Sequence, residues 1–281
     1  MGFVEAAKIA ARSALLEDIG PNILTGDITS ESVIGDEFGE AIIVAKEPGV
    51  IAGLPVLEVI FAELSPEVEW QPVFEDGAQV QVGQVVARIK GGLKVILKGE
   101  RCALNFLSHL TGIATLTKQF VEETQGRAKI FDTRKTTPGL RTLEKYAVRV
   151  GGGHNHRIGL FDAILIKDNH LFERDLATSI EAAKAAQAGL VEVEVETIEQ
   201  LKVAIASEAD IVLLDNMGIE EIKAAVLLAK GQVEVEVSGG IKLGNVSEIA
   251  EAGPDRISVG ALTQSAPAVD FSMTIVSRER T

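Results

Sequence analysis

The second half of the chain holds short apolar segments at a nearly regular spacing, and this recurrence constrains the fold more than any other feature. The segments begin about 20 to 33 residues apart and cover residues 129–134, 162–168, 191–196, 210–216, 233–239 and 256–260. Helical patterns lie between them, as in residues 175–189 and 218–230. Strands that alternate with helices at this spacing need right-handed crossovers, so they predict a parallel sheet or a β/α barrel.

The composition agrees with an α/β protein. Hydrophobic residues make up 46% of the 281 residues, aromatic residues only 4%, and there are 27 glycines. Aliphatic residues of this kind cover both faces of parallel strands, and the length is enough for one large domain or two smaller ones. The lone cysteine, Cys102, excludes an internal disulfide framework, fits a reducing compartment and is best explained as a small core residue.

The first hundred residues have a different pattern. Residues 2–20 form an amphipathic helical pattern with charges inside it, which argues against a signal peptide. Residues 40–54 and 68–91 contain short strand-like runs, and Asp76-Gly77 with Val82-Gly83 predict tight hairpins. This pattern resembles small sandwich modules that carry lipoyl or biotinyl groups, but the lysine expected at the tip is missing.

These patterns divide the chain into two expected domains. We expect an N-terminal α+β sandwich domain over residues 1–108 and an incomplete TIM-like β/α barrel, the catalytic domain, over residues 109–265. A helix from about Lys98 to residue 124 should join them. The tail, residues 266–281, is expected to be irregular and to pack on the first domain.

Positive charge is concentrated in one stretch of an otherwise acidic chain. Residues 127–157 hold eight Lys or Arg against Asp132 and Glu144, a local charge of +6, whereas the whole chain carries −14. This contrast favours a site for a small, multiply charged anion and argues against general binding to nucleic acids. No apolar run approaches the ~20 residues of a membrane span, so we expect a cytoplasmic protein.

Polar residues end nearly every predicted strand of the second half. Burying such charges is costly unless they are paired or contact a ligand, and in β/α barrels the site lies at the C-terminal ends of the strands. The strand ends therefore predict a site, with internal ion pairing around the rim as the alternative explanation. The residues concerned are Asp132, Arg134, Lys167, Asp168, Glu194, Glu196, Asp215, Asn216 and Ser238.

Two glycine-containing strand exits follow downstream, at Ser238-Gly239-Gly240 and at Gly260-Ala261. Backbone N–H groups at such exits bind phosphate, although glycine also serves ordinary turns. His154 and His156 have no third histidine or cysteine nearby, which disfavours zinc. His156 beside Arg157 fits a carboxylate site better.

Several motifs together resemble one known family. Residues 131–170 read FDTRKTTPGLRTLEKYAVRVGGGHNHRIGLFDAILIKDNH, and GDITSE, GERCALNFLSHLTGIAT, VEVEVE, LLDNM, VSGGI and ISVGALTQS occur in the expected order around them. The combination is similar to the quinolinate phosphoribosyltransferases, also called nicotinate-nucleotide pyrophosphorylases (carboxylating), of the type II phosphoribosyltransferase family. The resemblance covers nearly the whole chain. It implies that quinolinate and phosphoribosyl pyrophosphate form nicotinate mononucleotide, pyrophosphate and carbon dioxide, a step of NAD biosynthesis.

The resemblance also implies roles for individual residues. Quinolinate should be held by Arg101, Arg134, His156, Arg157 and Lys167. Phosphoribosyl pyrophosphate should be held by Lys135 at the phosphate or pyrophosphate, by Glu194 and Asp215 at the ribose hydroxyls, and by Ser238, Gly239, Gly240 and Gly260 at the 5′-phosphate. Thr133 should also bind substrate. Catalysis is expected from Lys135, Lys167, Glu194 and Asp215. His154 receives no role.

The same resemblance implies a cofactor and a partner. Mg²⁺ should bind mainly through pyrophosphate, with Glu194 and Asp215 as candidate protein ligands. Family members pair as homodimers in which Arg101 enters the neighbour's site, and a higher oligomer is compatible with this.

Other functions stay open at this stage. A paralogue associated with molybdenum transport is similar around DTRKT, but the PGLR, NHR and KDNH motifs favour the quinolinate enzyme. A related enzyme takes nicotinate and has no decarboxylation step; the number of carboxylate-binding cations argues against it. A lipoyl-like carrier would need the missing tip lysine.

Overall fold

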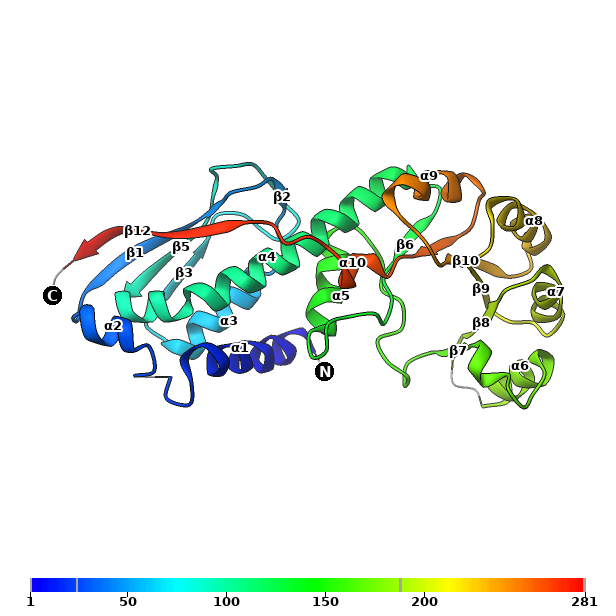
Figure 1. Cartoon of the computed structure of the whole chain (residues 1–281), viewed down its shortest axis with the longest axis horizontal. Coiled ribbons are helices and arrows are strands. Elements are labelled where there is room, and N and C mark those ends of the chain that lie inside the picture. Colours follow the sequence, from blue (N-terminus) through cyan, green and yellow to red (C-terminus); the bar gives the residue numbers. More distant parts are fainter. Residues whose placement is uncertain (1, 24, 187–188, 280–281) are drawn as a thin grey trace. The chain divides into compact units, whose positions relative to one another are not determined.

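The computed structural model describes residues 2–23, 25–186 and 189–279, which form two compact units (Figure 1). Unit 1 comprises Met1–Leu116, Thr137–Gly151 and Ala266–Thr281, and unit 2 comprises Thr117–Thr136 and Gly152–Ser265. The sequence pattern placed its boundaries at residues 108/109 and 265/266. Residues 137–151, expected within the barrel, cluster with unit 1.

Unit 1 contains a four-stranded antiparallel sheet in the order β12-β1-β5-β3 and a two-stranded sheet of β2 and β4. Its strands are β1 (Phe38–Ala45), β2 (Gly49–Val50), β3 (Glu69–Pro72), β4 (Gln79–Val80), β5 (Val85–Gly92) and β12 (Phe271–Glu279). Its helices are α1 (Phe3–Ile19), α2 (Ile28–Val33), α3 (Leu54–Leu64), α5 (Arg141–Val150) and the first part of α4 (Leu93–Thr124).

Local chemistry explains where several of these elements begin and end. Gly20 directly follows the last residue of α1 and terminates the helix, because its φ of 82° suits a residue without a Cβ. The Asp27 side chain caps α2 by accepting the Ser30 N–H at 3.0 Å. Asp76 accepts the Gly53 and Leu54 N–H groups at 2.7 and 3.1 Å, so it fixes the start of α3.

Three expectations for this region were wrong. The helix begins at Leu93 rather than near Lys98. Strands β4 and β5 do not form a hairpin, because β4 pairs with β2 in the other sheet. The tail is not irregular: β12 pairs with β1 from Phe38 opposite Glu279 to Ala45 opposite Phe271. Most of β12 is exposed, so its sequence has little of the apolar alternation that marks a half-buried strand.

Unit 2 contains a six-stranded parallel sheet in the order β6-β11-β10-β9-β8-β7. Its strands are β6 (Lys129–Phe131), β7 (Ile164–Ile166), β8 (Val191–Val195), β9 (Ile211–Asp215), β10 (Glu234–Ser238) and β11 (Arg256–Ser258). Its helices are the end of α4, the 3-10 helix η1 (Asp168–His170), α6 (Leu176–Ala185), α7 (Ile198–Ala206), α8 (Ile219–Ala229), α9 (Leu243–Glu251) and α10 (Ala261–Gln264). Every strand expected from the sequence is present.

Side-chain alternation gives the sheet of unit 2 two different faces. In β8 the valines at positions 191, 193 and 195 are buried, and α6 and α7 pack on this strand (Figure 1). The glutamates between them face the opposite way, because successive side chains of a strand point to opposite faces. The face away from the helices therefore carries the charged residues of the expected site. No helix among the described residues is long and apolar enough to cross a membrane.

Candidate active site

One pocket of about 550 Å³ lies in unit 2. It brings together all the residues to which the family resemblance gives a role except Arg101: Thr133, Arg134, Lys135, His156, Arg157, Lys167, Glu194, Asp215, Ser238, Gly239, Gly240 and Gly260. The polar strand ends Asp132, Asp168 and Glu196 do not line it. Asp215 and Ser238 are the last residues of β9 and β10, and Lys167 directly follows β7. In a parallel sheet these ends meet at one edge, which explains how distant residues converge. Arg101 is exposed on α4 in unit 1 and does not line this pocket.

A buried aspartate fixes the loop that carries His156 and Arg157. Asp132 follows β6 and is fully buried. Its carboxylate accepts the His156 N–H at 2.9 Å and also a hydrogen bond from the Asn155 side chain. The Asp132 N–H in turn donates to the carbonyl of His154 at 3.0 Å. The sequence marked Asp132 only as a polar strand end, whereas the structure shows that it positions the histidine–arginine loop.

Two guanidinium groups lie close together at the pocket. Burial lowers the pKa of Arg157, and the charge of Arg134 lowers it further. Arg157 Nη1 donates to the carbonyl of Ala163 at 3.1 Å, but its Nε is buried without a hydrogen-bond partner. A buried donor without an acceptor costs free energy, and two adjacent cations repel each other. Both costs are removed when an anion binds between them.

Lys167 and Glu194 form an ion pair across the pocket. The Lys167 side chain is 42% exposed and that of Glu194 only 12%, so the lysine is the more accessible partner. The Lys167 N–H donates to His170 Nδ1 at 2.9 Å, and the His170 N–H donates to the Lys167 carbonyl at 2.8 Å. The KDNH motif therefore folds into a tight turn that fixes the backbone of Lys167.

The glycines at the other side of the pocket are required by geometry. Gly239 has φ of 93°, and a Cβ there would lie 2.2 Å from Asn216 Oδ1. Gly240 has φ of 64° and open space where a Cβ would stand, so its backbone is accessible. At Gly260 a Cβ would lie 3.0 Å from Lys135 Cδ. Backbone that is free of side chains and next to a lysine suits phosphate oxygens.

Comparison with known proteins agrees with this geometry. Residues 27–111 match the model of the quinolinate phosphoribosyl transferase N-terminal domain, and residues 113–274 match that of the C-terminal domain. The chain is 42% identical over 266 residues to a Bacillus subtilis protein described as a probable nicotinate-nucleotide pyrophosphorylase (carboxylating), covering 92% of this chain and 90% of that protein. It is 39% identical over 280 residues to the Mycobacterium leprae nicotinate-nucleotide pyrophosphorylase (carboxylating), covering 96% and 98%.

A solved structure is equally similar. The nicotinate-nucleotide pyrophosphorylase of Francisella tularensis superposes with a TM-score of 0.93 at 39% identity, over 98% of each chain. This chain belongs to the quinolinate phosphoribosyltransferase family. The family fixes the enzyme class as a phosphoribosyltransferase, a glycosyltransferase of NAD biosynthesis.

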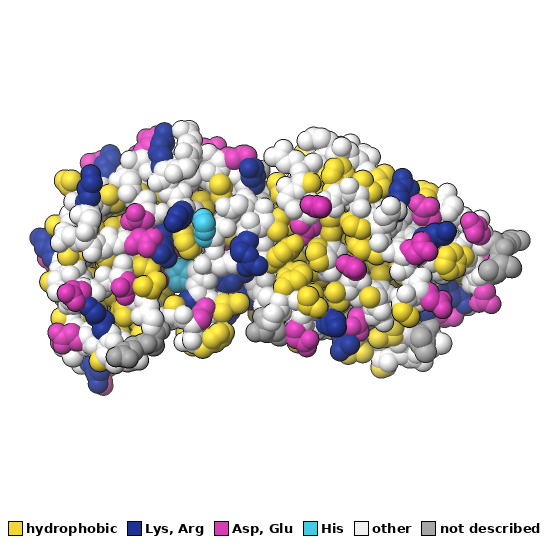
Figure 2. All heavy atoms as spheres, turned by 180° about the vertical axis from the view of Figure 1, so that it is seen from behind, with side chains coloured by type: hydrophobic (Ala, Val, Ile, Leu, Met, Phe, Trp, Pro, Cys, Tyr) yellow, Lys and Arg dark blue, Asp and Glu magenta, His cyan; other side chains and the backbone are white. Residues whose placement is uncertain are grey.

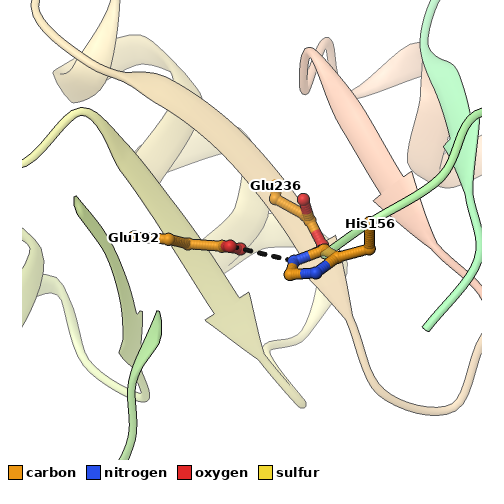
Figure 3. Close-up of side chains that lie close together, drawn as sticks. All are labelled: His156, Glu192 and Glu236. Atoms are coloured by element: carbon orange, nitrogen blue, oxygen red, sulfur yellow. Dashed lines mark ion pairs between the residues drawn. The ribbon is translucent and has the colours of Figure 1, made fainter. Parts of the chain in front are cut away.

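The pocket also contains residues that sequence reasoning missed. Glu236 lines it, and Glu192 lies beside His156 (Figure 3). Both glutamates sit in the middle of strands, so the search for polar strand ends did not select them. Lys242 and Gln264 also line the pocket, and so does Asn216, which the sequence had marked as a polar strand end. On the visible face of unit 2, Lys and Arg side chains lie beside histidine (Figure 2).

Proposed function

We propose that the pocket of unit 2 is the site at which this enzyme transfers a phosphoribosyl group to quinolinate with loss of carbon dioxide. The observation that carries the proposal is the pair of neighbouring cations, Arg134 and Arg157, with the buried Arg157 Nε that no acceptor in the described chain satisfies. A guanidinium binds a carboxylate through a planar pair of hydrogen bonds. A dicarboxylate between these groups supplies the missing acceptors and cancels the repulsion.

The two substrates would occupy different parts of the pocket. Quinolinate would contact Arg134, Arg157, Lys167 and the His156 ring. The phosphates of phosphoribosyl pyrophosphate would contact Lys135 together with the open backbone at Ser238, Gly239, Gly240 and Gly260, and Thr133 would complete this group. Glu194 and Asp215 would then bind the ribose hydroxyls, since both carboxylates face the same pocket.

The acidic side chains of the pocket fit a Mg²⁺ ion, which prefers oxygen ligands and keeps several waters. Asp215 accepts one hydrogen bond from Asn216 Nδ2 at 2.7 Å and has a second oxygen to offer. Glu194 already pairs with Lys167, so it would be the weaker protein ligand. We therefore propose that the ion is held mainly by pyrophosphate, with Asp215 and Glu194 nearby. When bound, it would neutralise charge on the leaving pyrophosphate.

The chemistry would be electrostatic. As the bond between C1 of the ribose and pyrophosphate breaks, positive charge develops at C1, and the Glu194 and Asp215 carboxylates are placed to stabilise it. Lys135 would stabilise the leaving group. The quinolinate nitrogen then bonds to C1, and the positive pyridinium nitrogen stabilises the electron pair that stays on C2 as the 2-carboxylate leaves as carbon dioxide. A proton from water then adds to C2 and gives nicotinate mononucleotide. Alignment of two held substrates would supply much of the acceleration.

We also propose a homodimer in which Arg101 contributes to the site of the neighbouring copy. Arg101 is exposed on α4 and does not line the pocket of unit 2. Unit 1 also exposes Ile9 and Leu16 of α1 with Ile28 and Val33 of α2, and hydrophobic side chains gather on its visible face (Figure 2). Exposed apolar area of this kind is typical of an interaction surface.

We also propose that the protein lies in the cytoplasm, a reducing compartment in which a free thiol stays reduced. The lone thiol, Cys102, is buried, and burial raises its pKa to about 11, so it would stay protonated and unreactive.

A turnover assay tests the function. Purified protein with Mg²⁺ and phosphoribosyl pyrophosphate is offered quinolinate and nicotinate in parallel. Nicotinate mononucleotide and carbon dioxide should form from quinolinate only. Product from nicotinate alone would keep the phosphate site and refute the dicarboxylate site, and no product from either acid would refute the proposed activity.

The dimer has its own test, because mixing two inactive variants distinguishes a shared site from a self-contained one. Arg101→Ala and Arg134→Ala should each be inactive. Mixed and re-equilibrated subunits should regain up to about a quarter of wild-type activity, since statistical pairing restores one intact site in half of the dimers. No recovery, with exchange shown by mass-tagged subunits, would contradict a site completed by Arg101 of the partner.

A further inference from the structure

A buried cluster of His156, Glu192 and Glu236 lies in the wall of the pocket (Figure 3). His156 Nε2 is 2.9 Å from Glu192 Oε2 and 3.7 Å from Glu236 Oε1. The side chains of His156, Glu192 and Glu236 are only 9%, 5% and 0% exposed. The three residues come from the loop between α5 and β7, from β8 and from β10, so they meet only in the folded unit.

The hydrogen bonds of His156 assign its ring proton. The Arg157 backbone N–H donates to His156 Nδ1 at 2.8 Å, so Nδ1 is an acceptor and carries no hydrogen. The ring proton is then on Nε2 and is donated to Glu192. A metal ion would need the lone pair of Nε2, which is occupied by this proton. The cluster is therefore a proton site rather than a metal site, although its three groups are spaced closely enough to surround an ion.

Glu236, unlike Glu192, does not accept the proton of His156, whose Nε2 lies 3.7 Å from Glu236 Oε1. Both of its carboxylate oxygens are buried and have no partner with hydrogen-bond geometry, although the Ser258 side chain is near enough to act on the pKa of Glu236; Glu192 Oε1 also lacks a partner. The nearest cation on the next strand, Arg256, is engaged with Glu234 through two contacts of 2.6 Å. An ionised carboxylate in such a place is costly, whereas a neutral carboxyl group is tolerated.

The groups around Glu236 come from every strand beside it. Its register partners are Leu213 on β9, which is apolar, and Arg256 on β11. Burial, followed by the charge of Glu192, raises the pKa of Glu236 to about 7, while His156, Ser258 and Arg256 oppose the shift. Glu236 therefore changes its charge close to neutral pH.

We infer that Glu236 is protonated when the anionic substrate binds and that this proton sets the affinity of the pocket for the dicarboxylate. The inference rests on the proposed function. Glu236 lines the same pocket as Arg134 and Arg157, so its negative charge acts on any anion held there. Loss of the proton would add a buried negative charge beneath the substrate. Inside a protein pocket, where the effective dielectric constant is far below that of water, one negative charge weakens the binding of an anion in the same pocket by roughly tenfold or more.

Thermodynamic linkage makes the inference measurable. If ionised Glu236 weakens quinolinate binding, then bound quinolinate must raise the pKa of Glu236 by the same free energy. Binding near pH 7 should therefore take up a proton from solution. The substrate cannot be the source of this effect, because carboxyl groups with pKa values near about 4 are fully ionised there.

Calorimetric titration of the intact protein with quinolinate, from about pH 6 to about pH 8.5 and in buffers of different ionisation enthalpy, tests this linkage. The wild type should lose about tenfold in affinity across the range and take up a fraction of a proton near pH 7. Glu236→Gln should bind with an affinity that is flat in pH, without that uptake. Glu199→Gln, the same change at an exposed position of α7, should behave as the wild type. A pH slope that survives in Glu236→Gln would overturn the inference.

An infrared measurement keeps the inference testable if quinolinate does not bind. Difference spectra between the wild type and Glu236→Gln should show the band of a protonated carboxyl group at about pH 6 that disappears by about pH 8.5. Absence of this band refutes the inference. If the band is present but the protein neither binds nor converts quinolinate, both the proposed function and the role of Glu236 in affinity are refuted. Only the protonation of the buried Glu236 carboxyl group would then stand.

Discussion

The sheets of the two units place their charged residues in opposite kinds of environment. In unit 1, Glu40 of β1 and Arg88 of β5 pair at 2.8 Å with side chains 30% and 45% exposed. In unit 2, Glu236 is completely buried and lacks a hydrogen-bond partner. Water stabilises the charges of unit 1 whether or not they pair, whereas those of unit 2 depend on a proton or a ligand. Unsatisfied polar atoms thus mark the unit in which we propose that substrate binds.

The largest expected effect distinguishes an arginine at the pocket of unit 2 from an arginine on the sheet of unit 1. Arg134→Ala should lower kcat/KM for quinolinate by about a thousandfold, because it removes one of two adjacent carboxylate-binding cations. Arg88→Ala should leave turnover unchanged and cost less than about 1 kcal/mol of stability, as exposed ion pairs do. Steady-state kinetics with thermal melts of both variants provide the check. Near-normal turnover of Arg134→Ala would show that the substrate lies elsewhere.

The next effect concerns stability and its pH dependence. The pKa of Glu236 is raised from 4.5 to about 7, so its proton stabilises the folded state fully below pH 4.5 and this stabilisation is lost as the pH rises to about 7. Glu236→Gln should therefore gain stability relative to the wild type above pH 7, on the order of 3 kcal/mol, and gain less as the pH falls.

A core variant of unit 1 sharpens this contrast. Ile43 of β1 is fully buried and has no titratable group. Ile43→Ala should cost about 2–5 kcal/mol at every pH, because it leaves a cavity. Urea denaturation at several pH values measures both variants. Equal pH profiles for Glu236→Gln and the wild type would mean that Glu236 is an ordinary carboxylate.

A lysine in each environment gives the third comparison. Lys167→Ala should lower turnover about a hundredfold, since it removes a pocket cation and leaves Glu194 unpaired near an anionic substrate. Lys184→Ala breaks the pair with Glu208 on the helical side of unit 2, where Glu208 is 83% exposed, and should leave turnover unchanged. If both variants lose activity equally, the loss reflects the fold rather than the pocket.

The smallest expected effect comes from two glycines with similar backbone. Gly239→Ala meets Asn216 at 2.2 Å and should raise KM for phosphoribosyl pyrophosphate about tenfold. Gly83→Ala in unit 1 has the same strain, at φ of 86°, but open space around it. It should cost about 1 kcal/mol and leave KM unchanged. A normal KM for Gly239→Ala would argue against phosphate at this backbone.

Much of the fold could be predicted because its signals are local. The spacing of the apolar segments located all six strands of unit 2, and polar strand ends indicated the edge at which Lys167 and Asp215 meet. The pairing of β12 with β1 could not be predicted in this way. It joins residues more than 200 positions apart through backbone hydrogen bonds, which leave no pattern in the side chains.

Two identical segments show what the sequence predicts about a glutamate and what it does not. Residues 191–195 and 233–237 both read VEVEV. The first segment is β8 and the second enters β10 at Glu234, and the valines within these two strands are buried toward the helices. Period-two alternation alone determined that arrangement, because it assigns all four glutamates to the opposite face. The family resemblance selected Glu194 among them through its motif position.

The tertiary structure decided what each glutamate does. Glu192 accepts the proton of a histidine, Glu194 pairs with a lysine, Glu234 pairs with an arginine, and Glu236 has no hydrogen-bond partner. Each partner comes from a neighbouring strand or loop that is distant in sequence. The charge state of a buried carboxyl group depends on which groups surround it in space, so only the folded chain determines that Glu236 is the glutamate of the four whose pKa is raised most clearly.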